Sequence, residues 1–277
     1  MEIDLTDKSL SQFERNEIEK LLKRENRDIT SDLEQMWYLI DLVWDDYQCD
    51  STSPDWDIIG KFYEHPVWLL NGLFIEQDLV STGHRHAITN WIVTNKLSNV
   101  VDYGGGFGTL ARMIAEKQTD IHVNIYEPHP SHFAISRSRE FHNISIIETL
   151  GSNYDCLVST DVLEHVPDPL DHFSEMVRSV NKNGYLVIAN AFFPMIKCHL
   201  PQTFHFRYSF NIFARLMGLE VVGKLDGSHA TIYKKLYDKT INWPAIRLIE
   251  KLSKALFPLI NISRPVIRPM RRLVLKS

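Results

Sequence analysis

Short apolar runs alternate with amphipathic segments through the middle of the chain. The apolar runs lie at residues 99–101, 121–127, 144–147, 154–161 and 185–189. Two of the segments between them, residues 109–117 and 170–180, place their apolar side chains on one helical face. Apolar runs joined by helices are typical of parallel strands that are buried on both faces. The pattern therefore predicts an α/β fold built on a doubly wound, mostly parallel sheet.

Helical patterns also flank this core on both sides. Apolar side chains recur at helical spacing in residues 9–24 and again from 32 to about 47, where Ser31-Asp32-Leu33-Glu34 fits a capping box. Residues 61–80 form a further aromatic-rich segment, which we expect to pack against the core. After the core, residues 243–256 have the pattern of a basic amphipathic helix.

Charge divides the chain into three parts. Residues 1–80 carry 19 acidic and 7 basic side chains, residues 81–237 carry 14 of each, and residues 238–277 carry 2 acidic and 9 basic ones. We therefore predict a helical N-terminal cap (1–80), a core (81–237) and a basic C-terminal extension (238–277). The basic helix can lie on an anionic membrane surface, or dock on the acidic cap of its own chain or of a second copy, and the sequence leaves these partners open.

One compact motif restricts the chemistry. Asp102-Tyr103-Gly104-Gly105-Gly106-Phe107-Gly108 gives the pattern D-x-G-x-G-x-G between a predicted strand and a predicted helix. Glycines let the chain turn sharply there and let its backbone approach a ligand, and the helix that begins at Thr109 offers free N–H groups. Glu127, at the end of the next strand, is positioned to accept hydrogen bonds from ribose hydroxyls. The motif therefore predicts a nucleoside-containing cofactor.

Two segments of the core resemble class I S-adenosylmethionine-dependent methyltransferases. The glycine pattern with its leading acid resembles the family's motif I, and residues 154–169 (YDCLVSTDVLEHVPDP) resemble the stretch after the fourth strand in small-molecule members. The resemblance covers roughly residues 82–237. It implies a seven-stranded Rossmann-like sheet, S-adenosyl-L-methionine as the cofactor, and N-terminal helices that cover the acceptor pocket. A dinucleotide fingerprint survives weakly, because G-x-G-x-x-G read from Gly106 ends on Ala111.

The resemblance also assigns the cofactor contacts. It implies that the glycine loop holds the methionine part, that Glu127 holds the ribose, and that Glu148, just after the third strand, lies at the adenine. The link from Glu148 to the fourth strand is short, so the helix that the family usually has there is reduced or absent. The full predicted set is Asp102, Gly104, Gly106, Gly108, Glu127, Glu148, Thr160 and Asp161.

Three histidines near the predicted strand ends are candidate bases. Methyl transfer is an in-line displacement that depends mainly on positioning, but an oxygen acceptor must also lose a proton, for which an imidazole is suited. His165 follows the fourth strand, and His199 and His205 lie in the loop of residues 198–208 after the fifth. Residues 83–86 (GHRH), expected just before the helix that leads into the first strand, could reach the cofactor carboxylate or the acceptor. No paired motif has metal-ligand spacing, so we predict no metal site.

Together these features predict an S-adenosyl-L-methionine-dependent methyltransferase of a small molecule or sugar-like acceptor, with O-methylation assisted by a histidine. The N/D-P-P-Y/F motif of enzymes that methylate amino groups is absent. The core is electrically neutral and has no aromatic-basic recognition motif, so we expect no nucleic-acid partner. The alternatives are an NAD(P)-dependent oxidoreductase and a non-catalytic methyltransferase-fold partner protein.

Export and membrane insertion are not indicated. The acidic start of the chain, Met1-Glu2-Ile3-Asp4, does not fit a signal peptide, and no apolar run reaches the length of about 18 residues that spans a bilayer. Cys49, Cys156 and Cys198 lie far apart without metal-type spacing. We therefore expect a reduced, cytoplasmic protein, with a basic extension that is able to contact a membrane peripherally.

Overall fold

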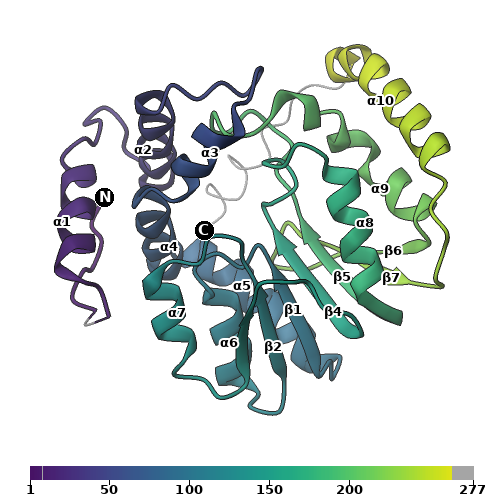
Figure 1. The fold of residues 1–277 in the computed structure, drawn as a ribbon, viewed down its shortest axis with the longest axis horizontal. Coiled ribbons are helices and arrows are strands. Elements are labelled where there is room, and N and C mark those ends of the chain that lie inside the picture. Colours follow the sequence, from purple (N-terminus) through teal and green to yellow (C-terminus); the bar gives the residue numbers. More distant parts are fainter. Residues whose placement is uncertain (8, 264–277) are drawn as a thin grey trace.

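A seven-stranded sheet forms the centre of the molecule (Figure 1). The computed structural model describes residues 1–7 and 9–263. Strands β1 to β7 are Asn99–Tyr103, His122–Tyr126, Ile144–Ile147, Tyr154–Thr160, Val180–Ala189, Leu219–Lys224 and Thr231–Lys235. Their order is β3-β2-β1-β4-β5-β7-β6, and only β7 runs antiparallel to its neighbours within this described sheet. The predicted doubly wound, mostly parallel sheet is confirmed.

Helices cover the sheet and build a cap beside it (Figure 1). The cap is built from four helices: α1 (Gln12–Leu22), α2 (Asp32–Asp46), α3 (Trp56–Tyr63) and α4 (Val67–Gln77). The later helices are α5 (Leu79–Thr94), α6 (Thr109–Lys117), α7 (His132–Ser138), α8 (Pro169–Ser179), α9 (Phe206–Leu216) and α10 (Trp243–Ser263), with a short 3-10 helix at Pro201–Thr203. Between β3 and β4 there is no helix, as the short link predicts.

Alternating side chains of the parallel strands enter two separate cores. In β1, Val101 packs in the core that includes side chains of α8 and α9, whereas Val100 packs in the core that includes those of α5 and α6. The same division separates Leu157 from Val158 in β4. A strand that is buried on both faces needs apolar residues at consecutive positions, which is why these strands read as continuous apolar runs.

The starts of the first two helices differ from the predicted capping. Ser31 accepts the Glu34 N–H at 3.4 Å, which is the first half of the predicted capping box at α2. The complete box lies at α1 instead, where Ser11 accepts the Glu14 N–H at 3.2 Å and the Glu14 carboxylate accepts the Ser11 N–H at 2.8 Å. Helix α1 therefore begins at Gln12 and not at the predicted Ser9.

Three further element boundaries were predicted incorrectly. Strand β5 begins at Val180 rather than Tyr185, because Asn183-Gly184 bulges out of the strand: Tyr154 pairs with Val180, but the next pair joins Cys156 to Tyr185. Helix α10 continues through Pro258 to Ser263, beyond the predicted end at Leu256. His84 and Arg85 lie within α5 and not before it. The predicted basic residues of the segment 264–277 lie outside the described residues.

The cap has its own apolar core and contacts the glycine motif directly. Buried side chains of α1 to α4 form one cluster, which Phe133 of α7 and Cys198 complete. Gly72 of α4 lies so close to the ring of Phe107 that an added Cβ would be 2.4 Å from it. Glu76 of α4 pairs with the buried Arg112 of α6, which also donates to the Phe107 carbonyl at 2.8 Å. The cap and the glycine loop are therefore packed as one unit.

Candidate functional site

The glycine loop turns between β1 and α6 through left-handed backbone conformations. Gly104, Gly106 and Gly108 have φ angles of 68°, 50° and 72°, a region that residues with a Cβ rarely occupy. At Gly104 a Cβ would also lie 2.5 Å from the Val162 side chain. At Gly106 the nearest atom would lie 3.9 Å from an added Cβ, an ordinary contact distance, and the residue is exposed, so this part of the loop is accessible. The spacing of the three glycines thus follows from backbone geometry, and the loop is open on the side where a ligand can approach.

Glu127 joins this loop to the end of β2. One of its carboxylate oxygens accepts the Gly106 N–H at 2.9 Å, and the other accepts the His129 N–H at 3.1 Å. The two backbone hydrogen bonds orient a half-buried carboxylate beside the exposed tip of the loop. Further lone pairs on the two oxygens are available to hydroxyl donors.

Asp102 lies beneath the loop, and its side chain is 2% exposed. Burial raises the pKa of this carboxyl to about 7, and the charge of Glu127 adds to the rise, whereas Arg85 of α5 opposes it. Arg85 is also under the electrostatic influence of Asp161 and Asp78, and its guanidinium donates to the Ser81 carbonyl at 3.1 Å. A cation from α5 therefore faces the acids at the ends of β1 and β4.

Thr160 and Asp161 form the carboxyl end of β4, next to the end of β5. Asp161 has a φ angle of 53°, and its N–H donates to the Ala189 carbonyl at 2.8 Å. Its carboxylate lies 3.3 Å from Nε2 of His229, and Nδ1 of His229 lies 3.2 Å from Nδ1 of His84. The contact with Asp161 raises the pKa of His229 although burial acts in the other direction. Sequence reasoning did not find His229, which no motif marks.

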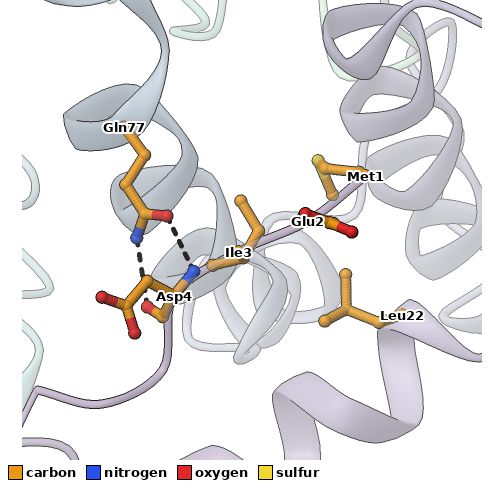
Figure 2. Close-up of a pocket in the computed structure, with 6 residues that line it drawn as sticks. All are labelled: Met1, Glu2, Ile3, Asp4, Leu22 and Gln77. Atoms are coloured by element: carbon orange, nitrogen blue, oxygen red, sulfur yellow. Dashed lines mark hydrogen bonds between the residues drawn. The ribbon is translucent and has the colours of Figure 1, made fainter.

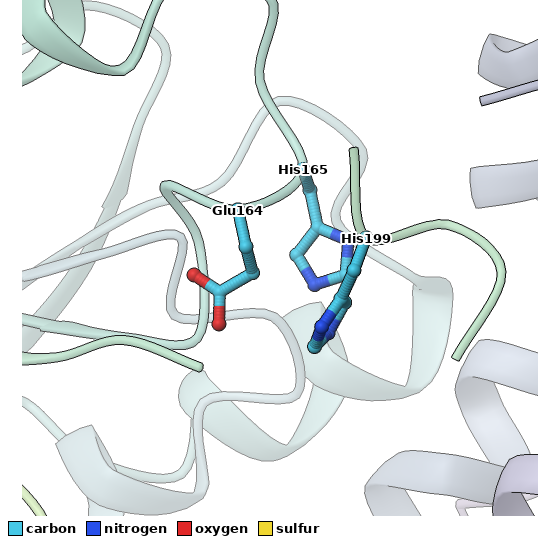
Figure 3. A group of neighbouring side chains, drawn as sticks. All are labelled: Glu164, His165 and His199. Atoms are coloured by element: carbon cyan, nitrogen blue, oxygen red, sulfur yellow. The ribbon is translucent and has the colours of Figure 1, made fainter. Parts of the chain in front are cut away.

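Glu164, His165 and His199 lie just beyond the ends of β4 and β5, and Figure 3 shows their side chains as neighbours, with the two imidazole rings close together. One ligand atom from each lies within 4.8 Å of the others. The loop after β5 is tied to Glu164 twice: the Ala191 N–H donates to its carboxylate at 2.6 Å, and the Leu200 N–H donates to its backbone carbonyl at 2.9 Å. These ties bring His199 next to His165.

Burial dominates the titration of this cluster. It lowers the pKa of His165 to about 3, and the neighbouring His199 contributes in the same direction. It also lowers the pKa of His199, against an opposing hydrogen bond to the Phe193 carbonyl. The pKa of the Glu164 carboxyl is raised by burial and then by the charge of Asp161. Both imidazoles are consequently neutral at physiological pH.

Aromatic side chains from the cap cover His165. The Tyr63 hydroxyl at the end of α3 lies 3.2 Å from Nδ1 of His165, although the two residues are 102 positions apart in the sequence. Trp68 of α4 stacks on Tyr63 at 5.2 Å and contacts the His165 ring edge to face at 6.4 Å. The Nε1 donor of Trp68 is buried without a hydrogen-bond partner among the described residues. Sequence analysis identified the aromatic segment but not these two residues.

Two predicted site residues lie apart from this cluster. His205 is 3% exposed, and its Nδ1 pairs with the Ser253 hydroxyl of α10 at 2.9 Å. The structure therefore gives it a packing contact with α10 in place of the predicted acceptor position. Glu148 is exposed after β3, and among the described residues no hydrogen bond fixes its carboxylate.

A separate hollow lies in the cap between the first residues of the chain, α1 and α4 (Figure 2). Met1 to Asp4, Leu22 and Gln77 line it. Asp4 and Gln77 hold its edge through two hydrogen bonds of 2.8 and 3.1 Å between the Asp4 backbone and the Gln77 amide. None of its lining residues belongs to the glycine loop or to the strand ends, so this hollow is not part of the candidate site.

Comparison with known proteins identifies the core. Residues 79–208 match the family model of a methyltransferase domain. No protein of curated function matches the sequence. The fold is similar to that of an O-methyltransferase family protein from Burkholderia thailandensis, with a TM-score of 0.53 and 14% identity over 79% of this chain and 77% of that one. The central part of the chain is therefore similar to methyltransferase domains, and its predicted Rossmann-like fold is confirmed.

Other solved structures are matched over smaller regions. The N-methyltransferase NodS from Bradyrhizobium japonicum WM9, in complex with S-adenosyl-l-homocysteine, is similar with a TM-score of 0.44 and 14% identity over 59% of this chain and 91% of that one. In the first three solved structures that the chain matches, it spans about half of their length, at 44, 56 and 50%. These similarities concern the fold and leave the acceptor open.

Proposed function

We propose that this chain transfers a methyl group from S-adenosyl-L-methionine to an oxygen of a small-molecule or sugar-like acceptor. The observation that carries the proposal is the hydrogen bond between the Gly106 N–H and the Glu127 carboxylate within a core that is similar to methyltransferase domains. It joins the loop suited to the methionine part of the cofactor to an acid suited to its ribose. An acid at the end of β2 that is oriented in this way has lone pairs available for hydroxyl donors.

The residues present fit this cofactor. The backbone of Gly106 is accessible, whereas Cβ atoms at Gly104 and Gly105 would strike Val162 and Asp102. In our proposal the loop holds the methionine part and Glu127 the ribose, while Asp102, Thr160 and Asp161 form the floor of the site. When bound, the cofactor supplies a methyl group on a positively charged sulfur. Arg85, the cation that faces these acids, is suited to the carboxylate of the methionine part.

The acceptor would bind between the cap and the ends of β4 and β5. Tyr63 and Trp68 offer an aromatic wall with an unpartnered indole N–H, which suits a flat or sugar-like molecule that carries oxygens. His165 and His199 lie at the same place, and their neutral imidazoles are able to accept a proton from a hydroxyl. The methyl group would then pass in line from sulfur to that oxygen.

Calorimetry with S-adenosylhomocysteine, NAD⁺ and NADP⁺ separates this proposal from the oxidoreductase alternative. We expect S-adenosylhomocysteine to bind with one site per chain and neither dinucleotide to bind at comparable concentrations. Binding of a dinucleotide alone would reject the proposal. Comparing extracts of cells with and without the gene, for metabolites that differ by the mass of a CH₂ group, then identifies the acceptor; no such difference favours a non-catalytic partner protein.

The exposed face of α10 supports a peripheral contact with an anionic membrane. Leu248, Leu252, Leu256, Leu259 and Ile262 are all exposed along this helix. Lys251 lies on the same helix, and the sequence from 264 to 277 contains five basic and no acidic residues. An apolar stripe accompanied by basic residues is typical of helices that lie in the membrane interface. Among the described residues, no helix is long and apolar enough to cross a bilayer.

A further inference from the structure

The side chains of Glu164, His165 and His199 form the cluster from which the inference starts (Figure 3). Two imidazole nitrogens and a carboxylate oxygen lie within 4.8 Å of one another, somewhat further apart than the ligands of one bound ion. His165 and His199 are 34 positions apart in the sequence, and they meet because Glu164 binds the loop after β5. Sequence spacing therefore could not reveal the cluster, and it led us to predict no metal site.

The hydrogen bonds of both imidazoles direct their free nitrogens. Nδ1 of His199 lies 2.7 Å from the Phe193 carbonyl, and Nδ1 of His165 lies 3.3 Å from the Cys198 carbonyl. A carbonyl can only accept, so a hydrogen on Nδ1 satisfies each of these contacts, and in that tautomer each Nε2 keeps its lone pair. The Tyr63 hydroxyl also lies 3.2 Å from Nδ1 of His165, and the Ala191 backbone also interacts with His199. Metal-binding histidines are commonly held in this way, with the second ring nitrogen donating to a backbone carbonyl.

Glu164 supplies an independent observation. Its side chain is fully buried, and one carboxylate oxygen accepts the Ala191 N–H. The other oxygen is also buried and makes no hydrogen bond of good geometry among the described residues, while the neighbouring Asp161 acts on the same carboxyl group and raises its pKa after burial. An unpaired buried carboxylate oxygen is costly, and a bound cation would compensate for it. Two imidazoles therefore lie beside a buried acid with one oxygen that makes no good hydrogen bond.

We propose that Glu164, His165 and His199 bind one divalent transition-metal ion. Two imidazoles and one carboxylate form a ligand set that zinc and ferrous iron accept, and such a set leaves coordination positions open. This inference rests on the proposed methyl transfer. The ion would occupy the imidazole lone pairs and replace these histidines as proton acceptors: it would take the acceptor oxygen in an open position and lower the pKa of its hydroxyl. The hydroxyl proton would leave to water, the oxygen would form a bond to the methyl carbon, and the C–S electron pair would stay on sulfur.

Cobalt(II) titration of the chelator-treated full chain tests the site without needing the acceptor. We expect one equivalent to bind, with visible absorption bands of a nitrogen- and oxygen-ligated ion, and zinc to displace it. His199→Ala and Glu164→Gln should each weaken cobalt binding at least tenfold. Glu164→Gln keeps the size of the side chain and an oxygen for the Ala191 N–H. This variant therefore still tests the metal site if His199→Ala fails to fold. His142→Ala removes an exposed histidine outside the cluster and should leave binding unchanged.

The two proposals fail in different ways. Binding of S-adenosylhomocysteine to the chelator-treated chain tests the cofactor site, and binding of cobalt tests the metal site. If the nucleoside binds but cobalt binds below a tenth of an equivalent, or equally well to Glu164→Gln, the metal proposal is wrong and the cofactor proposal stands. If cobalt binds as expected but the nucleoside does not, the proposed function is wrong and the metal site remains.

Discussion

Glu127 is the residue that connects the loop to the nucleoside in our proposal. Its two carboxylate oxygens already accept the Gly106 and His129 N–H groups, and these bonds fix the direction of the remaining lone pairs. A carboxylate held by backbone donors needs no reorientation when a ligand arrives, so little of its binding energy is lost to ordering. Its removal should therefore affect ligand affinity more than the fold.

Replacing Glu127 with alanine should weaken S-adenosylhomocysteine binding roughly 30-fold, which corresponds to about 2 kcal/mol for lost hydrogen bonds to a charged group. Calorimetry measures the change directly. Asp120→Ala is the matched control, because Asp120 is an exposed acid just before the opposite, amino end of β2. Equal affinities of the two variants would contradict the role of Glu127.

Asp102 should make stability depend on pH. Its folded pKa of about 7 lies above the unfolded value near 3.8, so the folded state favours the protonated form. The contribution of the Asp102 carboxyl to the free energy of unfolding is most favourable below about pH 4 and is lost as pH rises toward 7. Asp102→Asn, which cannot ionise, should therefore gain stability relative to the parent chain, by about 3 kcal/mol more at pH 8 than at pH 5.

Urea unfolding of both proteins at the two pH values measures this difference. Asp155→Asn is the control, since hydrogen bonds from Ser98 and Asn99 lower the pKa of Asp155 although burial opposes them. The ionised Asp155 carboxylate contributes the same amount to the free energy of unfolding throughout this pH range. The effect of Asp155→Asn should therefore be the same at pH 5 and pH 8. A stability difference of Asp102→Asn that does not change with pH would contradict the burial of an ionisable group there.

Helix α10 packs on the domain through one face and exposes apolar side chains on the other. Ile246 is buried against the core, and Arg247 pairs with Asp168 at the start of α8. The leucines on the other face, from Leu248 to Leu259, are between 50 and 68% exposed. One face thus fixes the helix to the domain, and the other leaves apolar area that is favourable to cover.

The double variant Leu252→Glu, Leu256→Glu should lose at least tenfold in binding to vesicles that contain phosphatidylserine, because it removes two apolar side chains and adds negative charge. Co-sedimentation of the full chain measures the partition. Phe13→Glu adds a charge at an exposed aromatic residue of α1 and should leave the partition unchanged. If the parent chain does not bind vesicles but is a dimer that the double variant dissociates, the face joins two copies instead.

An element can be predicted from sequence when neighbouring residues determine its bounds, and it is missed when contacts with distant residues determine them. Helix α6 has the predicted bounds because Gly108, in the left-handed conformation, ends the loop directly before Thr109. The start of β5 was missed because Asn183-Gly184 normally marks a turn, and only pairing with β4 shows that it forms a bulge. Among the candidate site residues, the glycines and Glu127 follow from one β-α-β unit. Tyr63, His229 and the His165–His199 contact arise from distant packing, for which one sequence has no signal.

For the whole molecule, the close contact between cap and glycine loop predicts that their stabilities are coupled. Gly72→Ala would place a methyl group 2.4 Å from the Phe107 ring, so either α4 or the loop must move. Overpacking of this kind costs about 1–3 kcal/mol, and we expect a melting temperature lower by roughly 3–8 °C together with weaker S-adenosylhomocysteine binding.

Gly60→Ala in α3 is the matched control for that experiment. A Cβ at Gly60 would meet nothing within 4 Å, so the same substitution should leave stability unchanged or raise it by up to about 1 kcal/mol. Differential scanning calorimetry of both variants, with and without the nucleoside, gives all the required values. If Gly72→Ala lowers the melting temperature but leaves nucleoside affinity intact, the cap and the loop are not coupled.

The composition of the cap cluster has a consequence for synthesis on the ribosome. The cap leaves the ribosome before the sheet does, since synthesis proceeds from the N-terminus. Phe133 and Cys198 complete its apolar core, and His165 meets Tyr63 only after another hundred residues have been added. During that interval the apolar faces of α2 and α4 have only part of their cover. We therefore expect the nascent chain to bind chaperones until the loop after β5 has emerged.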